Sequence, residues 1–186
     1  FPGLRPLAGV AEAPFPRPDL TIVQGAAQWD PATGYLFEPS APFPEIEDAP
    51  TQPECARRRE ALEALLEDFP FASPASRSGA LAMLFTQICR PAILGPVPAY
   101  MVDATTPGTG KTLLADVCSG VAYGRDAGRC HFPATTGRDG DAELGKRLGM
   151  LARMGSPMVC FDNTDDAIIG GDALEEIVST PTTYTF

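Results

Sequence analysis

Apolar residues recur along the chain at two spacings, and each spacing predicts its own kind of element. One apolar residue every three or four positions indicates a helix with one buried face. Short uninterrupted apolar runs indicate strands that are covered on both faces. The helical spacing predicts helices over about residues 54–69, 76–90, 111–123, 141–154 and 172–179. Their expected buried faces consist of Leu62, Leu65, Leu66 and Phe69, of Leu81, Leu84, Phe85 and Ile88, of Leu144, Leu148 and Leu151, and of Leu174, Ile177 and Val178.

The shorter apolar segments predict strands. Leu20–Gln24 and Gly34–Phe37 are expected to form a small β-hairpin, because the Asp, Pro and Gly residues of the stretch 29–34 suit a turn. Further strands are predicted at Tyr100–Val102, Cys130–Thr135 and Met158–Phe161, and Thr182–Phe186 alternates like the beginning of another.

The distribution of proline predicts how the chain is divided. Eleven of its 20 prolines fall within residues 1–53, and proline removes backbone donors, so long helices are excluded there. We predict a Pro-rich β appendage and linker in residues 1–53, a helical lead-in in 54–98 and an α/β core in 99–186. The aromatic residues of the appendage could stack on nucleic-acid bases, but a hydrophobic contact with the neighbouring domain is the favoured interpretation. They are Trp29, Tyr35 and Phe37.

The predicted strand Tyr100–Val102 leads into a loop of small residues that is closed by Lys111 and Thr112. Strand, small-residue loop, Gly-Lys-Thr and helix is the arrangement of a phosphate-binding loop. Gly108 and Gly110 would take positive φ and turn backbone N–H groups toward an anion, and the helix N-terminus behind them would add partial positive charge. The residues predicted to contact ATP are Thr106, Pro107, Gly108, Thr109, Gly110, Lys111, Thr112 and Leu113.

Within this loop, Lys111 is predicted to reach the β- and γ-phosphates and the Thr112 hydroxyl to hold Mg²⁺. The usual pattern GxxxxGK[ST] has glycine where this chain has Thr105, so only the second half of the motif, PGTGKT, is complete. The alternative is a Gly- and Thr-rich turn before an ordinary helix.

A second motif ends the apolar run Met158–Phe161 with Asp162, 51 residues after Lys111. Such an Asp is typical of the Walker B element, which holds Mg²⁺. A helix, a strand and a helix are predicted between the two motifs, which favours the additional-strand class of P-loop ATPases and disfavours small nucleoside kinases and GTPases. Thr112 and Asp162 are therefore the predicted metal ligands.

Asn163 is the third predicted catalytic residue, after Lys111 and Asp162. AAA+ ATPases usually have Glu at this position to activate the attacking water, and Asn cannot take a proton. Three alternatives stay open: Asp165 or Asp166 supplies the base, Asn163 only orients the water, or hydrolysis is slow.

Composition and charge limit the partners. The net charge of −10 means that the surface as a whole does not attract nucleic acid. The local run Arg57–Arg59 is best explained as a solvated face paired with Glu60, Glu63 and Glu67, rather than as a nucleic-acid or subunit contact. Five widely spaced cysteines and one histidine predict no metal cluster and favour a reduced, cytoplasmic protein. No apolar run approaches the ~20 residues of a membrane helix, and the chain, which starts at Phe1, is expected to be a fragment of a longer protein.

With both motifs in place, the chain resembles a group of helicase-like P-loop ATPase domains, of AAA+ or superfamily-3-like type, that phages, plasmids and integrated elements carry. The resemblance covers about the last two thirds of the chain. It implies an α/β P-loop NTPase core of the additional-strand type, incomplete at its C-terminus, in a ring-forming homo-oligomer that uses ATP to unwind or load DNA. The segments that carry it are VDATTPGTGKTLLAD (102–116), the helix entry 138–147, GSPMVCFDN (155–163) and the pair Gly170-Gly171.

Three rival functions stay open. The first is a nucleotide-binding scaffold without turnover. Asn163 favours it, and so does the lack of an arginine finger in this sequence, since the finger and the polar sensor residue of such ATPases are expected beyond residue 186. The second is a P-loop transferase such as a kinase, although no lid arginines or acceptor site can be identified. The third is an ATP-driven DNA loader or partition factor that does not unwind.

Overall fold

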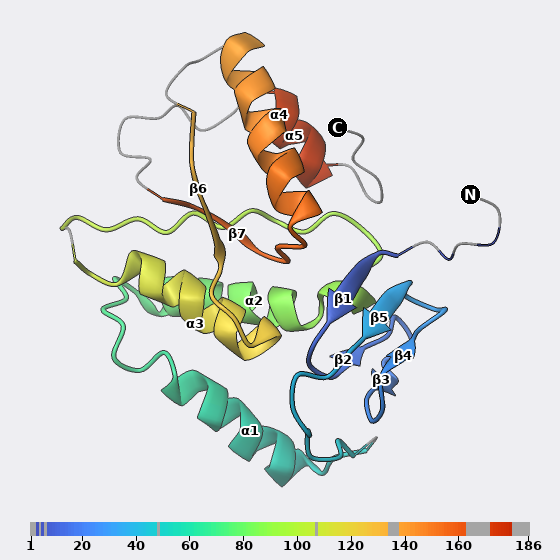
Figure 1. Cartoon of the computed structure of the whole chain (residues 1–186). Coiled ribbons are helices and arrows are strands. Elements are labelled where there is room, and N and C mark those ends of the chain that lie inside the picture. Colours follow the sequence, from blue (N-terminus) through green and yellow to red (C-terminus); the bar gives the residue numbers. More distant parts are fainter. Residues whose placement is uncertain are drawn as a thin grey trace. The chain divides into compact units, whose positions relative to one another are not determined.

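The computed structural model describes residues 3, 5, 7–47, 49–106, 108–133, 138–162 and 172–179. These residues form a mixed α/β structure with small sheets (Figure 1). The elements are β1 (Gly9–Ala11), β2 (Phe15–Pro16), β3 (Ile22–Val23), β4 (Gln28–Trp29), β5 (Tyr35–Phe37), α1 (Gln52–Ala64), α2 (Pro74–Ile88), the 3₁₀-helix η1 (Arg90–Ala92), α3 (Lys111–Tyr123), β6 (Gly128–His131), α4 (Arg138–Arg153), β7 (Val159–Asp162) and α5 (Asp172–Ser179).

The chain forms two compact units. The first unit comprises Phe1–Ala92 and Met101–Asp126 and contains β1–β5, α1–α3 and η1. The second comprises Ile93–Tyr100 and Ala127–Phe186 and contains β6, β7, α4 and α5. The division by sequence into 1–53, 54–98 and 99–186 stays a prediction.

The N-terminal strands pair differently from the predicted hairpin. β5 pairs in parallel with β1 and antiparallel with β4, whereas β3 pairs antiparallel with β2, so the two predicted strands belong to different sheets. The predicted turn before β5 is confirmed: Gly34 N–H donates to the Asp30 carbonyl and Asp30 N–H to the Tyr35 carbonyl, both at 2.8 Å. This turn connects β4 to β5. The predicted pairing was wrong because strands of two and three residues carry too little pattern to identify their partners.

A small apolar cluster is formed by side chains from both of these sheets. Phe15, Val23 and Phe37 are buried, and Tyr35 packs against them. The rings of Phe15 and Phe37 meet edge to face at 6.2 Å between centroids. Of the three aromatic residues predicted to contact a neighbouring domain, Tyr35 and Phe37 thus belong to this cluster. Trp29 lies outside it, with the guanidinium of Arg5 4.6 Å from its ring centroid.

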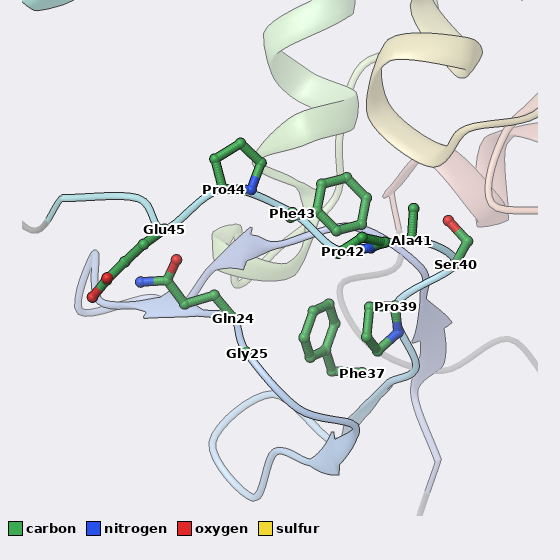
Figure 2. A pocket seen from close by; sticks show the side chains of 10 residues that line it. All are labelled: Gln24, Gly25, Phe37, Pro39, Ser40, Ala41, Pro42, Phe43, Pro44 and Glu45. Carbon is green, nitrogen blue, oxygen red and sulfur yellow. The ribbon is translucent and has the colours of Figure 1, made fainter.

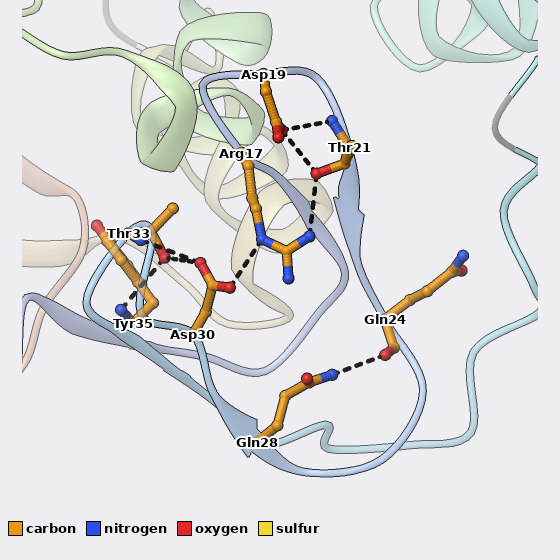
Figure 3. A network of polar contacts seen from close by, with 8 residues as sticks. All are labelled: Arg17, Asp19, Thr21, Gln24, Gln28, Asp30, Thr33 and Tyr35. Atoms are coloured by element: carbon orange, nitrogen blue, oxygen red, sulfur yellow. Dashed lines mark hydrogen bonds and ion pairs between the residues drawn. The ribbon is translucent and has the colours of Figure 1, made fainter.

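One buried carboxylate organises the polar side of the same region (Figure 3). Asp30 is only 2% exposed. Its Oδ1 accepts from Nε of Arg17 at 2.8 Å, and its Oδ2 accepts from the backbone N–H and the hydroxyl of Thr33 at 3.0 and 2.7 Å. Burial by itself would raise the pKa of Asp30, but the hydrogen bonds from Thr33 and Arg17 and the charge of Arg17 outweigh it and hold this pKa below the ordinary 3.8.

The proline-rich stretch after β5 is attached to the sheets. The Gln24 side chain donates to the Ile46 carbonyl at 3.0 Å and accepts from the Ile46 N–H at 2.8 Å. Residues 39–45 then curve past Phe37 and enclose a pocket of about 720 Å³ (Figure 2). The prolines therefore form part of the folded region instead of a free linker.

Helix α1 begins at Gln52, two residues before its predicted start, and ends early. The Thr51 N–H donates to the Glu54 carboxylate at 2.8 Å, half of a capping box. The helix ends at Ala64, not near residue 69 as predicted, because the chain continues in turns closed by bonds such as Leu66 N–H to the Glu63 carbonyl. Its side chains are not buried, and Arg59 pairs with Glu63 at 3.3 Å, as the solvated-face interpretation predicts.

Helices α2 and α3 pack against each other. The buried face of α2 consists of Ala80, Met83 and Leu84, so the predicted stripe is rotated: Phe85 is 41% exposed. On α3, Leu114, Ala115, Cys118 and Ser119 are buried, and burial raises the pKa of the Cys118 thiol to about 11. The Tyr123 hydroxyl fastens the C-terminal end of α3 to α2 by donating to Gln87.

The second unit confirms most of its predicted elements. Strands β6 and β7 are parallel, with His131 opposite Asp162. The predicted inward residues Leu144, Leu148 and Leu151 of α4 are buried, and Phe132, Phe161 and Leu174 pack against the first two. Helix α5 has its predicted bounds. The Ile177 side chain and the segment 182–186 lie outside the described residues.

No helix in the described parts of the chain is both long enough and apolar enough to cross a membrane.

Candidate functional site

The segment that leads into the small-residue loop is not the predicted strand. Residues 96–104 contain neither helix nor strand, and Met101 and Val102 are 80% and 39% exposed, although both were expected to be buried. Pro96 and Pro98 precede the predicted strand and have no N–H group to donate, so a strand could not continue through them toward the N-terminus. One of the three parts of the predicted strand–loop–helix arrangement is thus missing.

The two glycines of the loop have the predicted backbone conformation. Gly108 and Gly110 adopt φ of +80° and +85°, a region that residues with a Cβ rarely enter. Gly110 is the N-cap of α3, and its carbonyl accepts the first helical bond, from Leu114 N–H at 2.9 Å. The helix therefore begins at Lys111, as predicted.

The start of α3 suits an anion chemically. The first turn of an α-helix presents N–H groups that no carbonyl of the same helix accepts, and the helix dipole makes that end positive. Lys111 stands in this first turn and is partly exposed. Backbone donors and one ammonium group are the contacts by which phosphate-binding loops hold phosphate oxygens.

A buried polar atom in the loop lacks a partner. Thr109 Oγ1 is inaccessible to solvent and makes no hydrogen bond within the described residues. Other atoms of this kind are Trp29 Nε1, Arg77 Nε and Ser119 Oγ, but Thr109 alone among them lies between the two glycines of the motif.

An aromatic side chain contacts the loop, and sequence analysis missed it. Phe69 lies against Gly110, with Cε1 3.4 Å and Cδ1 3.8 Å from the point that a Cβ on Gly110 would occupy. The sequence pattern predicted Phe69 only as the last residue on the buried face of a helix over about residues 54–69. No periodic signal connects this residue with a loop about 40 residues later, so the contact depends on tertiary structure.

Asp162 is the last residue of β7, as predicted. Its Oδ2 lies 3.7 Å from Nη1 of Arg129, which comes from the neighbouring strand β6. Both side chains are partly exposed, at 36% for Asp162 and 45% for Arg129. The Arg129 contact is a second feature that the sequence does not reveal, since it depends on the register of β6 against β7.

The predicted site residues divide between the units. The loop with Lys111 and Thr112 belongs to the first unit and Asp162 to the second, so their convergence on one metal ion stays a prediction. Pro107 and Asn163 lie outside the described residues. Among the residues that are described, no three His, Cys, Asp or Glu side chains gather as a metal site; Mg²⁺ in nucleotide sites commonly uses only one or two protein ligands together with phosphate oxygens.

Comparison with known protein families, with curated proteins and with solved structures yields no match for this chain.

Proposed function

We propose that this chain binds ATP through the loop Gly108–Thr112 and hydrolyses it with Mg²⁺ as the metal. The observation that carries the proposal is the pair of positive φ angles at Gly108 and Gly110 directly before a helix that begins with Lys111 and Thr112. The order α3, β6, α4, β7 with Asp162 at the end of β7 supports it. The proposal rests on the loop and the helix, and not on a preceding strand.

In this proposal each residue type has one task. The backbone N–H groups of Gly108–Thr112 and the Lys111 ammonium bind phosphate oxygens. The Thr112 hydroxyl and the Asp162 carboxylate hold Mg²⁺, which would neutralise phosphate charge during phosphoryl transfer. Asn163, next in sequence to Asp162, orients the attacking water.

The resemblance to helicase-like ATPases extends the proposal to DNA. In that extended form, the energy of ATP hydrolysis moves single-stranded or forked DNA through a ring of identical subunits. Its test is the ATP turnover of the chain with and without single-stranded DNA. A turnover rate that DNA leaves unchanged would separate the ATPase from any DNA-driven function.

The Arg129 contact favours a second candidate, a nucleotide-binding scaffold or DNA loader with little turnover. A guanidinium 3.7 Å from Asp162 competes with a metal ion for the same carboxylate. If this contact restrains the reaction, Arg129→Gln should hydrolyse ATP faster than the unchanged chain while binding it equally well.

The primary test compares the two lysines of the chain. Lys111→Ala should weaken binding of a fluorescent ATP analogue by about 10- to 100-fold, because a hydrogen bond to a charged group contributes about 1.5–3 kcal/mol. Lys146→Ala removes the same charge from an exposed position on α4 and is the matched control.

Unchanged ATP affinity and turnover in Lys111→Ala would exclude this loop as the site. Equal losses in both lysine variants would instead assign the effect to net charge, and would also remove the support for the proposal.

A further inference from the structure

The residues between α1 and α2 hold two aromatic rings together. Phe71 N–H donates to the Phe69 carbonyl at 2.8 Å, across Pro70. A bond between residues two apart defines a γ-turn, and the fixed φ of proline suits its central position. The rings of Phe69 and Phe71 consequently lie 6.1 Å apart between centroids, with 35° between their planes.

One member of this pair, Phe69, lies against the glycine loop. The two atoms of Phe69 nearest to the Cβ position of Gly110 are Cε1 and Cδ1, which belong to one edge of the ring. Both phenylalanines are partly exposed, whereas the aromatic side chains Phe15 and Phe37 of the sheets are buried in their own cluster.

A nucleoside triphosphate has a flat base one ribose away from its phosphates. Bases stack on aromatic side chains, and each such contact contributes about 1–3 kcal/mol. A pair of partly exposed rings beside a phosphate-binding loop is thus placed where a base can reach it while the phosphates occupy the loop. We propose that Phe69 and Phe71 form the stacking platform for the base of the bound nucleotide. This inference rests on the proposed function of the loop.

The chemistry of the platform predicts its selectivity. Phenylalanine has no hydrogen-bond donor or acceptor in its side chain, so the pair cannot read the polar edge of a base. Stacking tolerates any base, because every base has a π face. ATP and GTP should therefore bind almost equally, and the smaller pyrimidine nucleotides more weakly.

The experiment separates the base from the phosphates. Binding of ATP and of inorganic tripolyphosphate is measured for the unchanged chain and for Phe71→Ala, Phe71→Trp and Lys111→Ala. Phe71 is the better target because Phe69 also supports the loop. Phe85→Ala, at an exposed phenylalanine of α2, is the matched control.

We expect Phe71→Ala to bind ATP about tenfold more weakly or worse and tripolyphosphate as before. Phe71→Trp should keep or improve ATP binding, Phe85→Ala should change neither ligand, and Lys111→Ala should weaken both. This pattern would support the platform.

Two results would overturn the platform while the loop stays in place: ATP affinity that Phe71→Ala leaves unchanged, or an equal loss of ATP and tripolyphosphate in that variant. Failure of the unchanged chain to bind either ligand is a different result. It would overturn the proposed function together with the platform.

Discussion

Asp30 in the sheets of the first unit and Thr109 in the loop before α3 are two buried polar residues in opposite states. Asp30 is buried and both of its oxygens accept hydrogen bonds from within the chain, from Arg17 and Thr33. In the loop, the buried Thr109 Oγ1 has no such partner among the described residues. The Asp30 carboxylate is thus satisfied from within the chain, whereas the Thr109 hydroxyl is not.

This difference distinguishes residues that stabilise from residues that bind. A buried polar group without a partner costs about 1–3 kcal/mol, so folding alone does not favour it. Mutation of Asp30, whose hydrogen-bond partners lie within the chain, should lower the free energy of unfolding. Mutation of the loop should mainly lower the affinity for the ligand. Each of the following experiments tests that distinction.

The largest effect is expected from Asp30→Ala. The variant removes the buried acceptor of three hydrogen bonds, from Arg17 Nε and from the N–H and hydroxyl of Thr33. Hydrogen bonds of this kind contribute about 1 kcal/mol each, so the free energy of unfolding should fall by about 3 kcal/mol. Urea unfolding measures this change, and Asp126→Ala, at an exposed carboxylate in the turn after α3, is the control. Equal unfolding midpoints for the two variants would mean that the Asp30 network does not hold the sheets together.

A smaller effect is expected from acid. The pKa of Asp30 lies below the ordinary 3.8 in the folded chain, so the folded state binds its proton less readily than the unfolded state. The stability that this carboxylate contributes is complete well above pH 3.8 and is lost as the pH falls below 3.8 through the folded-state pKa. Unfolding free energies measured from pH 6 down to about pH 3 should fall less steeply for Asp30→Asn than for the unchanged chain. Parallel curves would contradict the assignment.

The smallest effect on stability, and the sharpest contrast in binding, is expected from two glycines. Gly110 and Gly124 occupy the two ends of α3 with φ of +85° and +71°. Alanine at either position should cost about 1 kcal/mol, because a Cβ is unfavourable in the left-handed region. Only Gly110→Ala should also weaken ATP binding, since a Cβ is unfavourable at φ of +85° and a backbone shift at this position would displace the N–H groups of the loop. Equal ATP affinity in both variants would contradict a role of the loop in binding.

Sequence predicted the helices of this chain well where glycine or a strong apolar stripe marks them. The bounds of α3 follow from Gly110 and Gly124, and the inward face of α4 follows from Leu144, Leu148 and Leu151. For α2 the predicted face was rotated, because Ala80 and Met83 carry weaker apolar signals than the exposed Phe85.

Strands were predicted less well, since they depend on partners that are distant in sequence. The apolar run of β7 was found, but the same rule placed a strand at residues 100–102, where the structure has none. In the candidate site, the glycine conformations could be predicted because only glycine tolerates them. The positions of Phe69 and Arg129 could not, because the first is set by a tertiary contact and the second by strand register.

The hydrogen bonds between Gln24 and Ile46 have a practical consequence for dissecting this chain. They fix the end of the proline-rich stretch to Gln24, directly after β3. The segment that connects the sheets to α1 is therefore the short stretch between Ile46 and Gln52. Limited proteolysis should therefore cut in this stretch sooner than among the preceding prolines. A truncation intended to isolate the sheets should retain Ile46, because a chain that ends at Phe37 would lose the backbone partner of both Gln24 hydrogen bonds.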